Sequence, residues 1–528
     1  MNKIEMLDCT LRDGGYCNQW EFGNENIKKI IQGLIESEID IIECGYLTNK
    51  GDGNSDTSKY LEIEEVSNYI PSKREGKMFV VMMNWDEYDP QHLPDRSETC
   101  IDGIRVAFHK CDLQKGLDTC ASIKAKGYKV FVQAMISLNY SDREFLDLLE
   151  KIDELKPYAF YIVDSFGVMK KKRLMHMLYM VEKNLSEDIW IGFHAHNNLQ
   201  LAYANAQCLV DMPMNRNLII DSSVYGMGRG AGNLNTELFV DYLNENYGKN
   251  YKNKPLLGII DEILGSFYDK NSWGYTLSNY LSAIHNIHPN YSTFLDAKKT
   301  LTVKEMDSIF SMFEDEKKDI FDRSYADDKY FEFLDQKIDL IGIEKLDKLL
   351  KGKKVLLIAP GNSSIKERDK VRECAKNENM ISISVNFNYS EVETDFIFLS
   401  NLRRYRELTI DSLNKCIVTS NIPAENVYMK VSYKDLLNEE AYVHDNAGLM
   451  LINLLIKMNI KKVFLAGFDG YSFNENENYV SQKMVVYRKK EILEAMNCGI
   501  QKVLCDYRKK IDIEFLTEQK YICIEQIN

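Results

Sequence analysis

The sequence is poor in the features that mark disordered, membrane-spanning and disulfide-bonded proteins. Only 9 of its 528 residues are proline and 28 are glycine, which leaves no room for a long disordered or fibrous segment. The most apolar run, 449–460, contains Lys457 and is shorter than the roughly 20 residues that a membrane helix needs. None of the 12 cysteines belongs to a Cys-x-x-Cys pair, and acidic residues stand where a signal peptide would carry its apolar core. These absences predict a cytoplasmic protein with reduced thiols and no membrane partner.

Positive charge is also in short supply. The chain has 66 Lys and Arg against 80 Asp and Glu, a net charge of −14, which argues against a nucleic-acid partner bound over a broad basic face. Hydrophobic residues make up 45% and charged residues 28%, which is ordinary for a globular protein. At about 150 residues per domain, the length predicts three domains, or two if one of them is a large barrel.

The first 245 residues alternate short β-rich runs with helical segments. Apolar residues recur at three- and four-residue spacing between the runs, as at Ile27, Ile30, Ile31 and Leu34. This alternation predicts right-handed βαβ units, and eight units in this length favour a closed (β/α)8 TIM barrel over an open doubly wound sheet. The eight runs are 4–9, 40–44, 78–83, 103–107, 129–135, 159–164, 190–195 and 218–224.

The rest of the chain predicts two further parts. Residues 251–345 are helical in pattern and rich in aromatic residues, and we expect them to form an extension that packs on the barrel domain of residues 1–250. Residues 350–528 return to strand–loop–helix units and predict a second, Rossmann-like α/β domain with a parallel sheet. Its β-rich runs are 354–364, 381–387, 395–401, 415–420 and 461–471.

Charged and imidazole side chains gather where two barrel strands end, which is where barrel chemistry takes place. Arg12, Asp13 and Tyr16 follow the first strand, and His194 and His196 end the seventh, two residues apart and so on one face. Two imidazoles and one carboxylate suit a divalent metal such as Mn, Mg, Co or Zn. A surface ion pair and packed core histidines are the structural alternatives.

A glycine-rich turn, 226–232, follows the eighth strand. Barrels often bind a phosphate at this place, and the turn could equally bring the amide of Asn233 close to the metal. The strand–helix context of a dinucleotide-binding Gly-x-Gly-x-x-Gly motif is missing, so this turn does not indicate a dinucleotide cofactor.

Three motifs in this order, TLRDGG at 10–15, HAHNN at 194–198 and GMGRGAGN at 226–233, resemble those of the DRE-TIM metallolyases. That family includes HMG-CoA lyase, isopropylmalate and homocitrate synthases and 4-hydroxy-2-oxovalerate aldolase. The resemblance covers about residues 1–245. It implies a metal-dependent barrel that makes or breaks a carbon–carbon bond beside a 2-oxo acid, and a homo-oligomer, as a family-level expectation.

The resemblance also implies roles for particular residues. Asp13, His194 and His196 would ligate the divalent metal, and Asn233 matches a fourth ligand seen in part of the family. Arg12 would face the enolate oxygen of the substrate. Three polar residues at strand ends suit substrate contacts, with satisfied polar groups of the core as the alternative: Glu43, Asp164 and Ser165.

Departures from the family pattern narrow the reaction. The glycine turn lacks the catalytic cysteine of HMG-CoA lyase, Tyr16 stands where 4-hydroxy-2-oxovalerate aldolase has a histidine, and Gly-Gly-Tyr replaces the Gly-Glu-Gln of the condensing synthases. We therefore expect a divergent aldolase that acts on a 4-hydroxy-2-oxo acid through an enolate. Tyr16, His285, His288 or a metal-bound water could be the base. A Claisen-type synthase that joins an acyl-CoA to a 2-oxo acid is the alternative enzyme.

The second α/β domain carries a weaker signal. A strand feeds Gly361, Asn362 and Ser363, a turn that can present backbone N–H groups to a phosphate, although a plain strand–helix turn explains it equally well. This turn and the later stretch 462–471 are similar to those of sialyltransferase-like and pterin-pyrophosphokinase-like Rossmann domains. The similarity implies a nucleotide or nucleotide-sugar ligand. A third hypothesis makes the barrel a scaffold and this domain a glycosyltransferase-like module.

Overall fold

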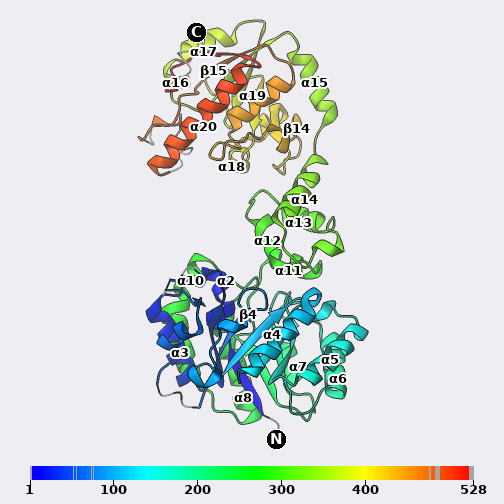
Figure 1. The fold of residues 1–528 in the computed structure, drawn as a ribbon. Coiled ribbons are helices and arrows are strands. Elements are labelled where there is room, and N and C mark those ends of the chain that lie inside the picture. Colours follow the sequence, from blue (N-terminus) through cyan, green and yellow to red (C-terminus); the bar gives the residue numbers. More distant parts are fainter. Residues whose placement is uncertain are drawn as a thin grey trace. The chain divides into compact units, whose positions relative to one another are not determined.

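The computed structural model of the chain describes residues 3–51, 53–54, 56–72, 74, 76–474, 477–481, 484 and 488–521. It separates into two compact units, which Figure 1 shows in the colours of the sequence. The first unit consists of Met1–Phe294 with Phe313–Asp322, and the second of Leu295–Met312 with Arg323–Asn528.

The first unit is built on a closed barrel of eight parallel strands, as the sequence predicts. β1 pairs with both β2 and β9, and this double pairing closes the sheet. A two-residue strand, β3 (Lys59–Tyr60), adds to β2 outside the ring. The barrel strands are β1 (Ile4–Asp8), β2 (Ile41–Leu47), β4 (Met78–Asn84), β5 (Gly103–Phe108), β6 (Lys129–Ala134), β7 (Ala159–Asp164), β8 (Trp190–Ala195) and β9 (Leu218–Ser222).

Amphipathic helices surround the barrel. In α5, a capping box between Ser141 and Glu144 fixes the first turn, and the buried face begins at Phe145. The α3 residues Ile27 and Ile30 are fully buried, as their spacing predicts. These helices are α3 (Asn24–Glu36), α4 (Leu113–Ala125), α5 (Asp142–Leu155), α6 (Lys171–Asn184), α7 (Ala202–Val210) and α8 (Thr236–Tyr247). Short 3-10 turns, η1 (Ile63–Asn68), η2 (Pro90–His92) and η3 (Arg96–Glu98), replace them on either side of β4.

The helical region after the barrel is divided between the two units. α9 packs on α3, where a Cβ on Gly33 would lie 2.8 Å from Ile259, so the two helices approach as closely as glycine permits. In the second unit, the backbone N–H of Asp339 donates to the carbonyl of Lys430 at 3.0 Å. The helices of this region are α9 (Asn253–Ile259), α10 (Gly265–Lys270), α11 (Leu277–Ile284), α12 (Pro289–Asp296), α13 (Val303–Phe310), α14 (Arg323–Asp335) and α15 (Leu340–Leu350).

The second unit contains a parallel sheet in the order β14-β13-β12-β11-β10-β15-β16. The chain moves outward from β10 to β14 and then returns to the other side of β10, so the strand order reverses between β10 and β15. Two short edge strands are not among the β-rich runs of the sequence. The strands are β10 (Lys354–Ile358), β11 (Met380–Val385), β12 (Phe396–Leu399), β13 (Cys416–Thr419), β14 (Met429–Val431), β15 (Lys462–Ala466) and β16 (Asp512–Phe515).

The most apolar run of the sequence is a core helix of this second sheet. α19 (Ala447–Lys457) has eleven residues, and Leu449, Leu451 and Leu455 are fully buried. The sheet also carries α16 (Ser363–Lys366), α17 (Arg368–Ala375), α18 (Leu402–Arg406) and α20 (Lys490–Arg508). Within the described part of the chain, no helix has the length and apolar character to cross a bilayer.

Candidate functional site

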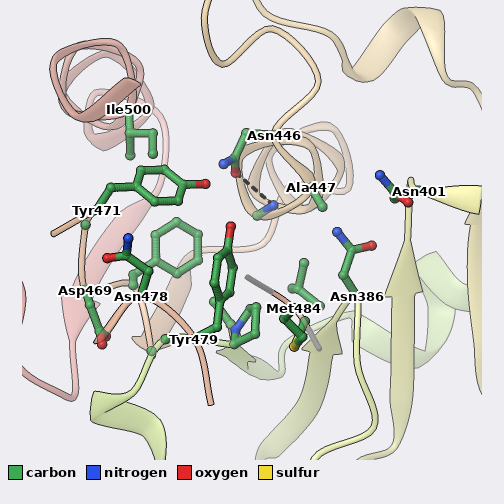
Figure 2. A pocket seen from close by; sticks show the side chains of 18 of the residues that line it. Asn386, Asn401, Asn446, Ala447, Asp469, Tyr471, Asn478, Tyr479, Met484 and Ile500 are labelled. Atoms are coloured by element: carbon green, nitrogen blue, oxygen red, sulfur yellow. Dashed lines mark hydrogen bonds between the residues drawn. The ribbon is translucent and has the colours of Figure 1, made fainter. Parts of the chain in front are cut away.

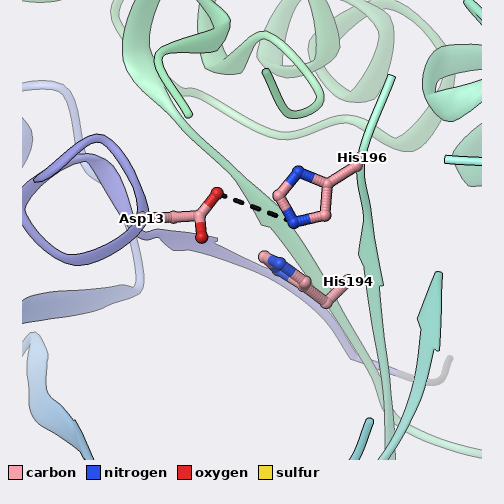
Figure 3. Close-up of side chains that lie close together, drawn as sticks. All are labelled: Asp13, His194 and His196. Atoms are coloured by element: carbon pink, nitrogen blue, oxygen red, sulfur yellow. Dashed lines mark ion pairs between the residues drawn. The ribbon is translucent and has the colours of Figure 1, made fainter. Parts of the chain in front are cut away.

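Three potential metal ligands meet inside the carboxyl end of the barrel. Asp13 ends the short helix α1 (Thr10–Asp13) directly after β1, His194 lies on β8, and His196 follows that strand. One ligand atom of each lies within 4.8 Å of the other two, and all three side chains are buried (Figure 3). The structure thus brings together the two histidines that strand periodicity places on one face and the aspartate that follows the first strand.

The Gly-Gly step after β1 lets the chain turn tightly enough to place Asp13 there. A Cβ on Gly14 would lie 2.3 Å from the carbonyl oxygen of Thr10. A Cβ on Gly15 would lie 2.1 Å from the indole ring of Trp20. Both positions therefore require glycine for steric reasons.

The charge states of Asp13 and His196 suit a cation. Burial lowers the pKa of His196 to about 3, so its imidazole is neutral. Burial also raises the pKa of Asp13, but the Arg12 guanidinium and the two imidazoles outweigh it and hold that pKa well below its usual range. Nδ1 of His194 lies 2.9 Å from Asp221. This contact fixes the ring and leaves Nε2 as the ring nitrogen that can bind a metal. The donor set is consistent with a divalent metal site.

Asn233 lies directly beside this cluster. Its Nδ2 donates to Asp13 at 2.6 Å and to the carbonyl of Met227 at 3.3 Å. Its Oδ1 is buried and has no hydrogen-bond partner in the described residues, so an acceptor is left over next to the carboxylate. A Cβ on Gly228 would lie 2.4 Å from the Asn233 amide, which explains the glycine at that place in the turn. The role of Asn233 as a fourth metal ligand stays a prediction.

Arg12 belongs to a buried network of ion pairs below the cluster. Its Nη1 lies 2.5 Å from Asp13 and its Nε 2.9 Å from Glu43, while Nη2 is buried without a partner in the described part of the chain. Arg105 pairs with the other oxygen of Glu43 at 2.9 Å and also contacts Asp221. Three carboxylates, Asp13, Glu43 and Asp221, thus fix two guanidiniums, and the Nη2 group of Arg12 remains to donate.

A cavity of about 70 Å³ opens over these groups. Tyr16 and Ser165 line it together with Arg12, the three potential ligands and Arg229. The Ser165 hydroxyl accepts the N–H of Ile136 at 3.0 Å. Tyr16 is 46% exposed, so it lies at the mouth rather than the floor.

Two other predicted contact residues lie away from the cavity lining. Glu43 faces the two guanidiniums described above. Asp164 accepts the backbone N–H groups of Val168 and Met169, both at 2.9 Å, and so holds the turn after β7. Of the histidines considered as bases, His285 and His288 are also absent from the lining, and Nε2 of His288 lies 3.2 Å from Arg229.

Sequence reasoning passed over Asp221, Arg105 and Arg229. The first two are ionisable residues inside otherwise apolar strand runs, and that contrast was a usable signal, because such residues are rarely fully buried unless they are paired. Arg229 stands in the glycine turn, but its role could not be predicted because distant segments form its surroundings.

A second cavity, of about 240 Å³, lies at the carboxyl ends of the second sheet (Figure 2). It sits where the strand order reverses, between the turns after β10 and β15. Amides and aromatic rings point toward it, and Asn446 accepts the N–H of Gly448 at 3.1 Å where α19 begins. Its polar and aromatic lining includes Asn386, Asn401, Asn446, Phe468, Tyr471, Asn478 and Tyr479.

The predicted phosphate turn borders this cavity through Gly361. A Cβ on Gly361 would lie 2.3 Å from the carbonyl oxygen of Gly467, so the turns after β10 and β15 touch. The backbone N–H of Ser363 donates to Asp469 at 2.8 Å, and its hydroxyl contacts the same carboxylate at 2.5 Å. Asn362 precedes α16 and makes no side-chain cap. The N–H of Ser363 is thus engaged within the protein.

Comparison with known proteins identifies relatives of the barrel. A family model described as HMGL-like matches residues 109–254. The 4-hydroxy-2-oxovalerate aldolase of Geobacillus genomosp. 3 is 26% identical over 243 residues, which cover 46% of this chain and 70% of the relative. The 4-hydroxy-2-oxovalerate aldolase 2 of Comamonas testosteroni is 27% identical over 244 residues, 45% of this chain and 67% of the relative.

Solved structures also resemble the chain. The N-terminal domain of a candidate aldolase from Bacteroides vulgatus is 28% identical, with a TM-score of 0.48, and the match covers 55% of this chain and 96% of that one. The HMG-CoA lyase of Brucella melitensis is 15% identical, with a TM-score of 0.41, over 51% of this chain and 99% of that one. The second sheet lies beyond the family match, which ends at residue 254. The barrel thus matches an HMGL-like family model over residues 109–254 and is similar to 4-hydroxy-2-oxovalerate aldolases over about 45% of the chain.

Proposed function

We propose that the barrel is a divalent-metal-dependent aldolase that cleaves a 4-hydroxy-2-oxo acid into a pyruvate-like 2-oxo acid and an aldehyde, and joins them in reverse. The observation that carries this proposal is the buried cluster of Asp13, His194 and His196 beside the partly unpaired guanidinium of Arg12. The aldolase relatives support the same reaction class.

Cleavage breaks the bond between C3 and C4 of the substrate. Its electron pair forms the enolate over C3, C2 and the 2-oxo oxygen, the 4-hydroxyl loses its proton, and C4 becomes the aldehyde carbonyl. Protonation of C3 then yields the 2-oxo acid. A bound divalent ion supplies Lewis-acid polarisation of the 2-oxo group. Asp13, with its pKa well below the usual range, and neutral His196 provide donors for that ion.

Two further side chains of the cavity have roles in this reaction. The unpartnered Nη2 of Arg12 donates toward the oxygen on which enolate charge grows, and the guanidinium is already held in place by Glu43 and Asp13. We place Tyr16 at the 4-hydroxyl, because it lines the cavity and His285 and His288 do not. Burial raises the pKa of Tyr16, so its phenol is neutral and acts as a relay: its oxygen accepts the 4-hydroxyl proton as its own proton passes to water at the mouth.

Exchange of the pyruvate methyl protons tests the proposal without knowledge of the aldehyde. In D2O, the metal-loaded protein is expected to replace those protons with deuterium, because enolate formation is the shared half-reaction, and a chelator is expected to stop the exchange. NMR measures the exchange, and release of pyruvate from 4-hydroxy-2-oxo acids measures cleavage. Metal-loaded protein that gives neither signal contradicts the proposal, and thiol release from an acyl-CoA would indicate the Claisen-type synthase instead.

We further propose that the second sheet binds a nucleotide or nucleotide-sugar. The observation that favours this is the position of its cavity at the carboxyl ends of the strands where their order reverses, the usual ligand site of open α/β sheets. Amides of Asn386, Asn401 and Asn478 offer donors and acceptors, and the rings of Tyr471 and Tyr479 offer stacking surfaces.

Titration of the full chain with cytidine mono- and diphosphate tests this second function. Saturable binding is expected by calorimetry, and Asn386→Gly is expected to weaken it roughly tenfold, since hydrogen bonds in a buried site are worth about 1 kcal/mol or more. Glycine tolerates the φ of 62° at this position, so the change removes the amide and spares the backbone. Asn377→Ala, in an exposed turn, is the control. No heat at millimolar nucleotide refutes the proposal.

A further inference from the structure

One guanidinium of the barrel cavity, that of Arg229, forms no ion pair with any of the described residues. Its Nη1 lies 3.2 Å from Nε2 of His288, and its Nη2 donates to the carbonyl of Ser165 at 3.3 Å. Its Nε is enclosed and has no acceptor among the described residues.

The two neighbouring guanidiniums, by contrast, are paired with carboxylates. Arg12 is paired with Asp13 and Glu43, and Arg105 with Glu43 and Asp221. A guanidinium that is partly withdrawn from water without an acid is costly, since burial of an unpaired charge is strongly unfavourable. An anionic group of a bound ligand would neutralise the charge of Arg229.

The groups around Arg229 hold it but do not neutralise it. Burial, and then the Arg229 charge itself, lower the pKa of His288 to about 3, so this imidazole is neutral. The guanidinium carbon lies 5.5 Å from the centre of the Tyr16 ring, which is a cation–π contact. These contacts fix the fork of the guanidinium at the rim of the cavity.

Depth in the cavity decides which end of a substrate meets Arg229. The potential metal ligands Asp13, His194 and His196 are at most 5% exposed and form the floor. Arg229 is half-buried and its neighbour Tyr16 is 46% exposed, so both lie toward the mouth. A 2-oxo acid held by its carboxyl end at the floor extends its fourth and later carbons toward the guanidinium.

We infer that Arg229 selects substrates that carry a second anionic group, a carboxylate or phosphate, on the aldehyde half. This inference rests on the proposed aldolase function and gives its substrate class: a 4-hydroxy-2-oxo acid with an oxyanion at the far end. Cleavage then releases pyruvate and an anionic aldehyde, with the same bond changes as above. The fork of Arg229 pairs with the oxyanion in both directions of the reaction.

Binding of matched, non-cleavable acids is the first test, and it needs no turnover. 2-Oxoglutarate and 2-oxopentanoate share a five-carbon chain, and the former ends in a carboxylate where the latter ends in a methyl group. The metal-loaded protein is expected to bind 2-oxoglutarate roughly 10- to 100-fold more tightly, the range of a hydrogen-bonded charge pair. Arg229→Gln is expected to erase that preference, Arg229→Lys to keep part of it, and the exposed Arg143→Gln on α5 to leave it unchanged. Equal affinities for the two acids in the unaltered protein overturn the inference.

The aldol direction is the second test and separates the two anions. Pyruvate is offered with succinic semialdehyde against butanal, and with glyceraldehyde 3-phosphate against glyceraldehyde. The charged member of at least one pair is expected to have a kcat/KM at least tenfold higher, and Arg229→Gln is expected to lower that value much more than the value for its neutral partner. An equal loss for both members, through a higher KM for pyruvate, would assign Arg229 to the pyruvate carboxylate and overturn the inference. Absence of pyruvate proton exchange would refute the aldolase, while the binding preference would still decide the role of Arg229.

Discussion

Purified protein is expected to hold about one divalent ion per chain, and His194→Ala to hold almost none under the same conditions. The substitution removes one of three side chains whose ligand atoms lie within 4.8 Å, so it leaves a carboxylate and one imidazole for the cation. Elemental analysis of dialysed samples measures the content. Asp221→Asn is expected to give an intermediate result, with affinity lower by roughly 10- to 100-fold, because Asp221 fixes the His194 ring through Nδ1 at 2.9 Å.

His176→Ala is the matched control for this experiment. His176 lies on α6, is 45% exposed, and contacts Asp142 at 2.9 Å, well away from the cavity lining. Its removal is expected to leave the metal content at the level of the unaltered protein. Equal metal content in His194→Ala and His176→Ala would show that the bound ion lies elsewhere, and the barrel cluster would lose its proposed role.

The barrel and its cluster could be predicted because they depend on local periodicity. Each of the eight β-rich runs became one barrel strand, since alternation of strands and amphipathic helices leaves few topologies. His194 and His196 share a face for the same reason, and the end of β1 brings Asp13 to the same edge.

Pairings across the barrel could not be read from the sequence. Arg105 and Asp221 are 116 positions apart and meet only because β5 and β9 both turn side chains into the interior. The unpaired state of Arg229 is equally hidden, since it depends on which acids fail to reach it. No periodicity encodes that absence.

The second domain shows the limit of short motifs. The Gly361, Asn362 and Ser363 turn suggests a phosphate site, yet the N–H of Ser363 is bonded to Asp469, which follows β15. Only the sheet order places these two turns together. The edge strands β14 and β16 escaped prediction because charged residues, Lys430 in β14 and Asp512 and Glu514 in β16, interrupt their short runs.

Arg12→Lys is expected to lower kcat by roughly 10²- to 10³-fold, the usual cost of losing one preorganised donor to a developing oxyanion, or about 3–4 kcal/mol. Lysine keeps the charge, but it cannot hold Glu43 and Asp13 and donate a third N–H in a fixed plane, as Arg12 does. Pyruvate formation from the best 4-hydroxy-2-oxo acid, and proton exchange in pyruvate alone, measure the change.

Metal content separates this effect from damage to the site. Arg12→Lys is expected to retain most of its metal, because the ligand atoms of Asp13, His194 and His196 are unchanged, whereas His194→Ala loses metal and turnover together. Turnover in Arg12→Lys within threefold of the unaltered protein would contradict the role of Arg12. Loss of metal in Arg12→Lys would instead make Arg12 a residue that positions Asp13, which lies 2.5 Å from its Nη1. The two measurements together therefore distinguish charge stabilisation of the enolate from assembly of the metal site.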